Sequence, residues 1–141
     1  MSRESRAVLV VEDDADVRVW MVLVLRRQGY LVLEAADGLR AIRVIEQHEP
    51  AAETIGLILL DMMLPFLSGV ELLRGLCDHL NGIPIVAVSG SLKELGEASA
   101  AGATDVLAKP FSAAQMLDTV ARHWPPQRGE ARRTSPGPTI A

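Results

Sequence analysis

Five short apolar runs, each followed by a segment of helical periodicity, constrain the fold of this 141-residue chain more than any other feature. The runs are rich in Val, Ile and Leu, which is typical of strands covered on both faces. They span Val8–Val11, Leu31–Leu33, Leu57–Leu60, Ile83–Val88 and Thr104–Leu107. Because parallel strands need right-handed crossover connections, the simplest topology is one five-stranded parallel sheet with helices on both faces. We therefore predict a doubly wound α/β domain.

Helix boundary residues support this alternation. The first predicted helix, about Ala15 to Gln28, is followed by Gly29, which is well placed for a left-handed C-cap. We expect this helix to bury one face, made of Val17, Trp20, Met21, Val24 and Leu25. Asp37 and Gly38 indicate the start of the second helix. Three later starts have the spacing of a capping box, namely Ser68 with Glu71, Ser91 with Glu94, and Ser112 with Gln115.

The chain has room for one domain of ordinary size, which we predict to span residues 1–124. From residue 125 to 141 the sequence is rich in Pro, Gly, Ser and Arg and has no apolar period, so we expect a flexible tail. Its three arginines offer contacts to an acidic partner, although a solvated tail or linker is the simpler interpretation.

Charge and composition exclude several classes. A net charge of −4 and a pI near 5.3 argue against a nucleic-acid-binding surface, which needs clustered Lys and Arg. The single Cys77 cannot form an intramolecular disulfide, and the amino terminus meets acidic residues too soon for a signal peptide. The apolar runs are shorter than a bilayer span. We expect a cytoplasmic protein without a membrane segment.

Polar residues follow four of the predicted strands. Glu12 and Asp13 come after the first, Asp61 after the third, Ser89 after the fourth and Lys109 after the fifth. The carboxyl ends of parallel strands meet at one edge, where open α/β folds place their chemistry, so these side chains should converge. Taken singly, each residue has an ordinary structural interpretation, as a solvated carboxylate, a strand-end hydroxyl or a surface cation. Together they favour a functional site.

The chemistry of this set follows from its charges. Three carboxylates at one edge disfavour full ionisation unless a cation neutralises them, and all-oxygen ligands suit Mg²⁺. Lys109 and Ser89 could each contact an oxygen of an incoming phosphoryl group, which leaves one carboxylate as its acceptor. The set therefore outlines an aspartyl-phosphate site.

Four stretches in this order resemble the receiver domains of two-component response regulators. They are VLVVEDD, LLDMMLPFLSG, VSGS and KPF, and the resemblance runs from about Ala7 to Trp124. It implies a flavodoxin-like (βα)5 fold with strand order 2-1-3-4-5. It also implies that a sensor histidine kinase or a histidine phosphotransfer protein phosphorylates Asp61, and that the domain is a signalling switch more than an enzyme.

The same resemblance implies a role for each site residue. Glu12 and Asp13 would be the acidic pair that holds Mg²⁺, with Asp61 and the backbone carbonyl of Met63 completing the protein ligands. Ser89 would be the switch hydroxyl and Lys109 the phosphate-binding lysine. A cis peptide is expected between Lys109 and Pro110.

Two departures from the family pattern bear on mechanism. The fifth-strand position where relatives often carry a switching aromatic ring is Val106, so we expect a smaller or differently transmitted change, routed through Ser89 and its loop. At the variable positions that influence attack by water the chain has Met63 and Ser91. Neither offers an amide or carboxylate to orient that water, so we hypothesise slow self-dephosphorylation.

The first helix also carries Val19, Val22 and Leu23 outside its core face. They could form a docking patch for a kinase or phosphotransfer protein, or neighbouring helices could cover them.

The three histidines lie on separate predicted helices, so we expect no shared role for them; they are His48, His79 and His123.

These observations predict a stand-alone receiver, monomeric or dimerising on phosphorylation, that signals to an unidentified protein and does not bind DNA. Two rivals remain. One is the receiver module of a hybrid kinase or larger regulator, with the tail as its linker. The other is a phosphatase with an aspartyl nucleophile, although such enzymes usually have a second acid where this chain has Met63.

Overall fold

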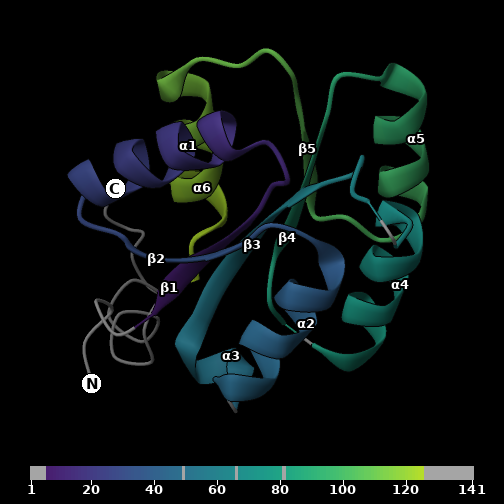
Figure 1. The fold of residues 1–141 in the computed structure, drawn as a ribbon, viewed down its shortest axis with the longest axis horizontal. Helices are drawn as coiled ribbons and strands as arrows, with labels where there is room; N and C mark the ends of the chain where they lie inside the picture. Colours follow the sequence, from purple (N-terminus) through teal and green to yellow (C-terminus); the bar gives the residue numbers. More distant parts are fainter. Residues whose placement is uncertain (1–5, 49, 66, 81, 126–141) are drawn as a thin grey trace, which may run out of the picture.

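The computed structural model describes residues 6–48, 50–65, 67–80 and 82–125. Within them, five parallel strands form one sheet in the order β2-β1-β3-β4-β5, which confirms the predicted topology (Figure 1). The strands are β1 (Ala7–Val11), β2 (Leu31–Ala35), β3 (Ile55–Asp61), β4 (Ile85–Ser89) and β5 (Asp105–Ala108).

Helices cover both faces of this sheet. The helices of the described part of the chain are α1 (Ala15–Arg27), α2 (Gly38–Gln47), α3 (Ala51–Thr54), α4 (Gly69–His79), α5 (Leu92–Ala100) and α6 (Ala113–His123). Figure 1 shows α1 and α6 on one face and α2, α4 and α5 on the other. The four-residue α3 was not predicted, because a single turn is too short to show periodicity.

The pleat of the central strands divides the core into two halves. Along β1, Val8 and Val10 pack with side chains of α1 and α6, whereas Leu9 and Val11 pack with those of α2, α4 and α5. β1, β3 and β4 are buried throughout. The outer strands are not, since Leu31 of β2 is 49% exposed. The expectation that all five strands are covered on both faces is therefore wrong for the edges.

α1 begins and ends at identifiable caps. The Asp14 carboxylate accepts hydrogen bonds from the amides of Asp16 and Val17 at 2.9 and 3.1 Å, which makes Asp14 the N-cap. Gly29 follows the last turn with φ of 94°, so the predicted left-handed cap is confirmed. The predicted core face is only partly correct, because Trp20 is 38% exposed and packs against the Phe111 ring.

The other predicted boundaries shift by a few residues. β4 begins at Ile85, two residues later than predicted, after Pro84, whose carbonyl accepts a hydrogen bond from the Ile58 amide at 3.0 Å.

At the end of the domain the Trp124 ring packs on Tyr30, with 5.0 Å between ring centroids. The predicted tail lies outside the described residues except for Pro125. No helix in the described ranges is long and apolar enough to cross a membrane.

Gly69 allows α4 to begin close under the end of β3. A Cβ atom at this position would lie 2.4 Å from the backbone carbonyl oxygen of Met62, the residue after Asp61. Backbone cannot move away as a flexible side chain can, so the close approach requires glycine. The position of the loop after Asp61 thus depends on this residue.

We expect Gly69→Ala to lower the free energy of unfolding by about 1–3 kcal/mol, because the added methyl group must displace backbone. Gly75 is the matched control on the same helix, since a Cβ there meets nothing within 4 Å. Gly75→Ala should raise stability by about 0.5–1 kcal/mol through better helix propensity. Urea unfolding of both variants measures the difference, and equal effects would contradict the packing argument.

Candidate functional site

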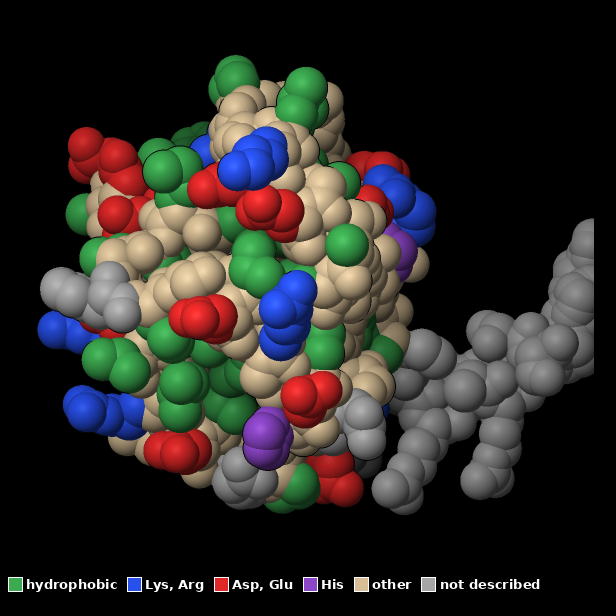
Figure 2. All heavy atoms as spheres, turned by 90° about the vertical axis from the view of Figure 1, so that its right-hand side faces the viewer, with side chains coloured by type: hydrophobic (Ala, Val, Ile, Leu, Met, Phe, Trp, Pro, Cys, Tyr) green, Lys and Arg blue, Asp and Glu red, His purple; other side chains and the backbone are tan. Residues whose placement is uncertain are grey.

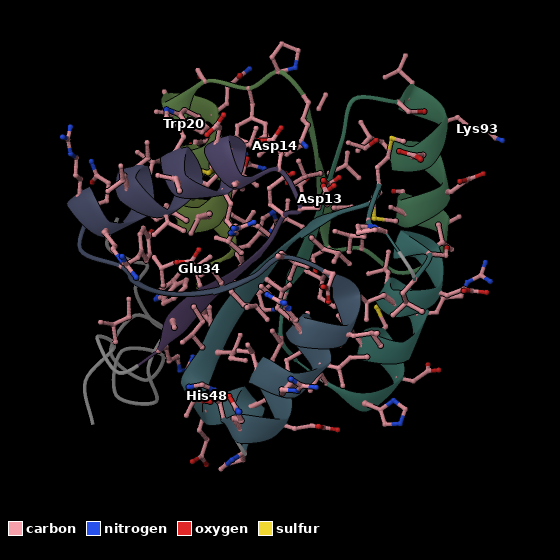
Figure 3. The ribbon with its side chains drawn as sticks, in the orientation of Figure 1. Asp13, Asp14, Trp20, Glu34, His48 and Lys93 are labelled. Carbon is pink, nitrogen blue, oxygen red and sulfur yellow. The ribbon has the colours of Figure 1, made fainter. Side chains whose placement is uncertain are left out.

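Three carboxylates converge at the carboxyl edge of the sheet. One oxygen each from Glu12, Asp13 and Asp61 lies within 4.8 Å of the others. Glu12 and Asp61 are 1% and 3% exposed, whereas Asp13 is open to solvent. Figure 3 shows Asp13 at the end of β1, beside the first turn of α1. The predicted convergence of the acidic residues is confirmed.

Strand register explains why these residues meet. β1 and β3 are neighbours, and Val11 pairs with Leu60, so Glu12 and Asp61 follow paired residues. Each is also held by a hydrogen bond that involves a backbone amide. The Glu12 amide donates to the carbonyl of Ala35 at 3.1 Å, and the Met63 amide donates to Oδ1 of Asp61 at 3.0 Å.

Lys109 reaches the same pocket from the end of β5. Its Nζ lies 2.9 Å from Oε1 of Glu12 and 3.3 Å from Oδ2 of Asp61. Its amide donates to the carbonyl of Ser89 at 2.9 Å, which ties the lysine to the end of β4. The peptide between Lys109 and Pro110 is cis, as expected. One cation is thus shared by two buried carboxylates.

Burial dominates the electrostatics of Asp61. Desolvation raises the pKa of its carboxyl to about 7, and the Glu12 carboxylate adds to the rise, while the Met63 amide and Lys109 oppose it. Burial lowers the pKa of the Lys109 ammonium, but its contacts with Glu12 and Asp61 outweigh that effect, and its pKa is raised. Positive charge in the pocket therefore favours ionised Asp61.

The carboxylate set fits a divalent cation. Oε1 of Glu12 is buried and accepts no hydrogen bond within the described part of the chain, although the Lys109 ammonium lies 2.9 Å away as its ion-pair partner. A cation would satisfy that oxygen and offset the mutual repulsion of the three acids. Hard oxygen donors with one open, solvent-facing member suit a hydrated ion such as Mg²⁺.

Ser89 ends β4 and is 1% exposed, but its hydroxyl bonds in another direction. It donates to Oε1 of Glu94 on α5 at 2.5 Å, and its oxygen accepts from the Ser91 amide at 3.0 Å. Among the described residues, no hydrogen bond links the Ser89 hydroxyl to Asp61 or Lys109. Ser89 thus lies at the predicted edge without joining the acidic cluster.

Sequence reasoning missed two residues near the site. Glu94 was interpreted only as a capping partner of Ser91, and Arg18 was not considered. Arg18 on α1 donates to the backbone carbonyl of Glu12 at 2.8 Å and forms an ion pair with Glu34 of β2 at 3.2 Å. The contact of Ser89 with Glu94, five residues later, has no recognised sequence spacing, so it had no sequence signal.

The other residues that the sequence analysis singled out differ in their exposure and contacts. Val19 and Leu23 are 52% and 53% exposed, but Val22 is 4% exposed, so two of the three proposed patch residues face outward. Met63, two residues after Asp61, is 63% exposed. The three histidines contact separate partners, which are the carbonyls of Val44 and Gly75 and the carboxylate of Asp105.

Comparisons with known proteins agree with this geometry. The sequence profile of the response regulator receiver domain matches residues 8–121. Sporulation initiation phosphotransferase F of Bacillus subtilis is 30% identical over 120 residues, which cover 84% of this chain and 93% of that protein. The CAI-1 autoinducer sensor kinase/phosphatase CqsS of Vibrio cholerae is 32% identical over 125 residues, or 85% of this chain. The match spans only 18% of that kinase.

Solved structures give the same result. Chemotaxis protein CheY4 of Vibrio cholerae superposes with a TM-score of 0.73 at 28% sequence identity. The superposition covers 84% of this chain and 98% of that one. The fold is therefore shared over nearly the whole of the described sheet and its helices.

The raised pKa of Asp61 predicts pH-dependent stability in metal-free protein. An unfolded aspartate titrates at about 3.9, whereas folded Asp61 titrates at about 7. The folded state binds the extra proton between these values, so this contribution to stability falls as pH rises from about 4 to about 7. We expect Asp61→Asn to be more stable than wild type at pH 8 by more than about 1 kcal/mol. The advantage should be lost near pH 4.

Urea unfolding in EDTA at both pH values measures this difference. Asp13→Asn is the matched control, because it removes the same charge from the exposed member of the cluster. Its effect should be smaller. A stability difference for Asp61→Asn that does not change with pH would show that its carboxyl is not perturbed by burial.

Proposed function

The chain belongs to the response-regulator receiver domain family, and from this membership we propose that it is a phospho-accepting switch with Asp61 as the acceptor. The supporting observation is the burial of the Asp61 carboxylate beside Lys109, at 3.3 Å, with two more acids within reach. The donor would be a sensor histidine kinase or a histidine phosphotransfer protein. The output would be a contact with another protein.

In the proposed transfer an oxygen of Asp61 attacks the phosphorus of a phosphohistidine. A phosphorus–oxygen bond forms, the phosphorus–nitrogen bond breaks, and the electron pair goes to the imidazole of the donor. Met63 holds one oxygen of Asp61 through its amide at 3.0 Å, which fixes the orientation of the carboxylate. The product is an acyl phosphate that water later hydrolyses, returning the free carboxylate.

Glu12, Asp13, Asp61 and the backbone carbonyl of Met63 would hold Mg²⁺. When bound, the ion would neutralise the carboxylates and the charge that develops on the phosphoryl oxygens. Lys109 already contacts Glu12 and Asp61, so its ammonium could move to a phosphoryl oxygen over a short distance. Ser89 would donate its hydroxyl to a second phosphoryl oxygen after leaving Glu94.

We place the receiver domain at residues 1–124, since the Trp124 ring still packs on Tyr30 and stands over Gly56. Two relatives bear on whether the domain acts alone. The match to nearly all of a sporulation phosphotransferase supports a stand-alone receiver. The match to 18% of a sensor kinase supports the alternative of a module in a hybrid kinase, with residues 125–141 as its linker.

Incubation with acetyl phosphate and Mg²⁺ tests this function by intact-protein mass spectrometry. We expect one phosphate adduct on wild type, none on Asp61→Asn and none when EDTA replaces Mg²⁺. Lys109→Gln should retain folding but reduce labelling by about 10-fold or more, because a neutral amide replaces the ammonium.

Two outcomes would contradict the proposal. An adduct that persists in Asp61→Asn would place the acceptor elsewhere in the chain. Steady turnover of a small phosphomonoester such as p-nitrophenyl phosphate would favour an aspartyl phosphatase instead of a switch.

The lifetime of the adduct gives a further prediction. Met63 is 63% exposed and offers no polar group to orient an attacking water. Met63→Asn should speed loss of the adduct by about 10-fold, a gain within the range of a positioned polar group. Met63→Leu is the apolar control and should hydrolyse like wild type. An unchanged rate in Met63→Asn, followed by mass spectrometry after donor removal, would show that this position does not set the lifetime.

A further inference from the structure

The Ser89 hydroxyl takes part in the hydrogen bonds that cap the N-terminus of α5. Its proton goes to Oε1 of Glu94 at 2.5 Å, and its oxygen accepts the Ser91 amide at 3.0 Å. Because a serine hydroxyl has one proton, it cannot donate to Glu94 and to a second acceptor together. While the hydroxyl donates to Glu94, it is therefore not available to the phosphoryl site.

Comparison with α6 shows what is unusual here. In α6 the capping box is direct, since Gln115 donates its amide to Ser112 at 3.1 Å and its side chain accepts the Ser112 amide at 2.8 Å. In α5 the Ser91 hydroxyl accepts the Glu94 amide at 3.3 Å. The return bond, however, runs from the Ser91 amide through the Ser89 hydroxyl to Glu94.

We propose that Glu94 is a positioning residue that withholds the Ser89 hydroxyl from the phosphoryl site, and that α5 alternates between this relayed cap and a direct capping box. The proposal rests on the proposed function, because the competing acceptor is the phosphoryl group on Asp61. A charged phosphoryl oxygen is an acceptor comparable with the Glu94 carboxylate. The hydroxyl can therefore be transferred from one to the other.

The two groups that Ser89 leaves behind complement each other. Its departure frees the Ser91 amide and the Glu94 carboxylate, which are donor and acceptor at the spacing of a capping box. Formation of the direct bond would keep the helix capped in both states. The exchange therefore has two discrete arrangements, as a switch requires.

The rearrangement would reach the surface through the first turn of α5. Leu92 and Lys93 lie between the two capping residues, and they are 84% and 85% exposed. Figure 3 shows Lys93 on the outer side of α5, and Figure 2 shows hydrophobic and charged side chains side by side on the face over α4 and α5. A protein partner that contacts this turn would bind the two capped arrangements differently.

Glu94→Gln tests the withholding role, because the neutral amide keeps the size of the side chain but is a weaker acceptor. We expect labelling of Asp61 by subsaturating acetyl phosphate to be severalfold faster than in wild type, and the adduct to be lost more slowly. Glu97→Gln removes the same charge one turn later, where the side chain only faces Lys93 at 3.9 Å, and should label like wild type.

A double-mutant cycle separates the hydrogen bond from general charge effects. In a Ser89→Ala background there is no hydroxyl to withhold, so Glu94→Gln should no longer change the labelling rate. An equal acceleration in both backgrounds would mean that Glu94 merely repels the anionic donor, and would overturn the proposal.

Amide hydrogen exchange at Ser91 gives a readout independent of rate. In wild type the amide has an acceptor in both arrangements, so its protection should persist when Asp61 is phosphorylated. In Glu94→Ala the direct acceptor is missing, so exchange at Ser91 should accelerate only after phosphorylation. Equal exchange in the two proteins after phosphorylation would contradict the alternating cap.

The outcomes distinguish this proposal from the one on which it rests. If wild type is labelled on Asp61 and Glu94→Gln behaves identically, the withholding role is wrong and the phospho-acceptor function stands. If wild type takes up no phosphate, both proposals fail.

Discussion

The rest of the site depends on two carboxylates that the fold buries against one lysine. Glu12 follows β1 and Asp61 ends β3, and both side chains are buried, so neither can turn fully to water. Lys109 lies within 3.3 Å of both. One ammonium compensates part of two buried negative charges, which leaves the pocket short of positive charge. The uncompensated negative charge lowers the stability of the fold at this edge. It also favours binding of a cation or movement of the lysine there.

Much of the fold could be predicted because buried parallel strands leave a strong pattern. The runs that became β1, β3 and β4 are apolar at every position. The crossover rule then predicts a parallel sheet with helices on both faces, and the family resemblance supplies the strand order. Exposure at the edges was not predictable in the same way. Leu31 and Trp20 are as apolar as core residues, and only the tertiary position of β2 and α1 leaves them partly in solvent.

The site was predictable to the same extent and for the same reason. Residues that follow parallel strands must meet, so Glu12, Asp61 and Lys109 could be grouped from their positions alone. The partner of the Ser89 hydroxyl could not. Ser91 and Glu94 have the spacing of a local capping box, and nothing in that spacing shows that a strand-end serine takes one of its places. A contact from the end of β4, five residues before Glu94, replaced the direct bond within the helix cap.

That replacement bears on how a switch can work without a ring at Val106. A hydrogen bond to a charged group contributes about 1.5–3 kcal/mol net, and one between neutral groups about 0.5–1.5 kcal/mol. Exchange of the bonds around Ser89 therefore involves free energies of the size of typical allosteric coupling, about 1–3 kcal/mol. Val106 is a partly buried residue packed against the core, and its side chain has few alternative positions. The N-terminus of α5 is a better candidate for the moving part, because its donors and acceptors can pair in two ways.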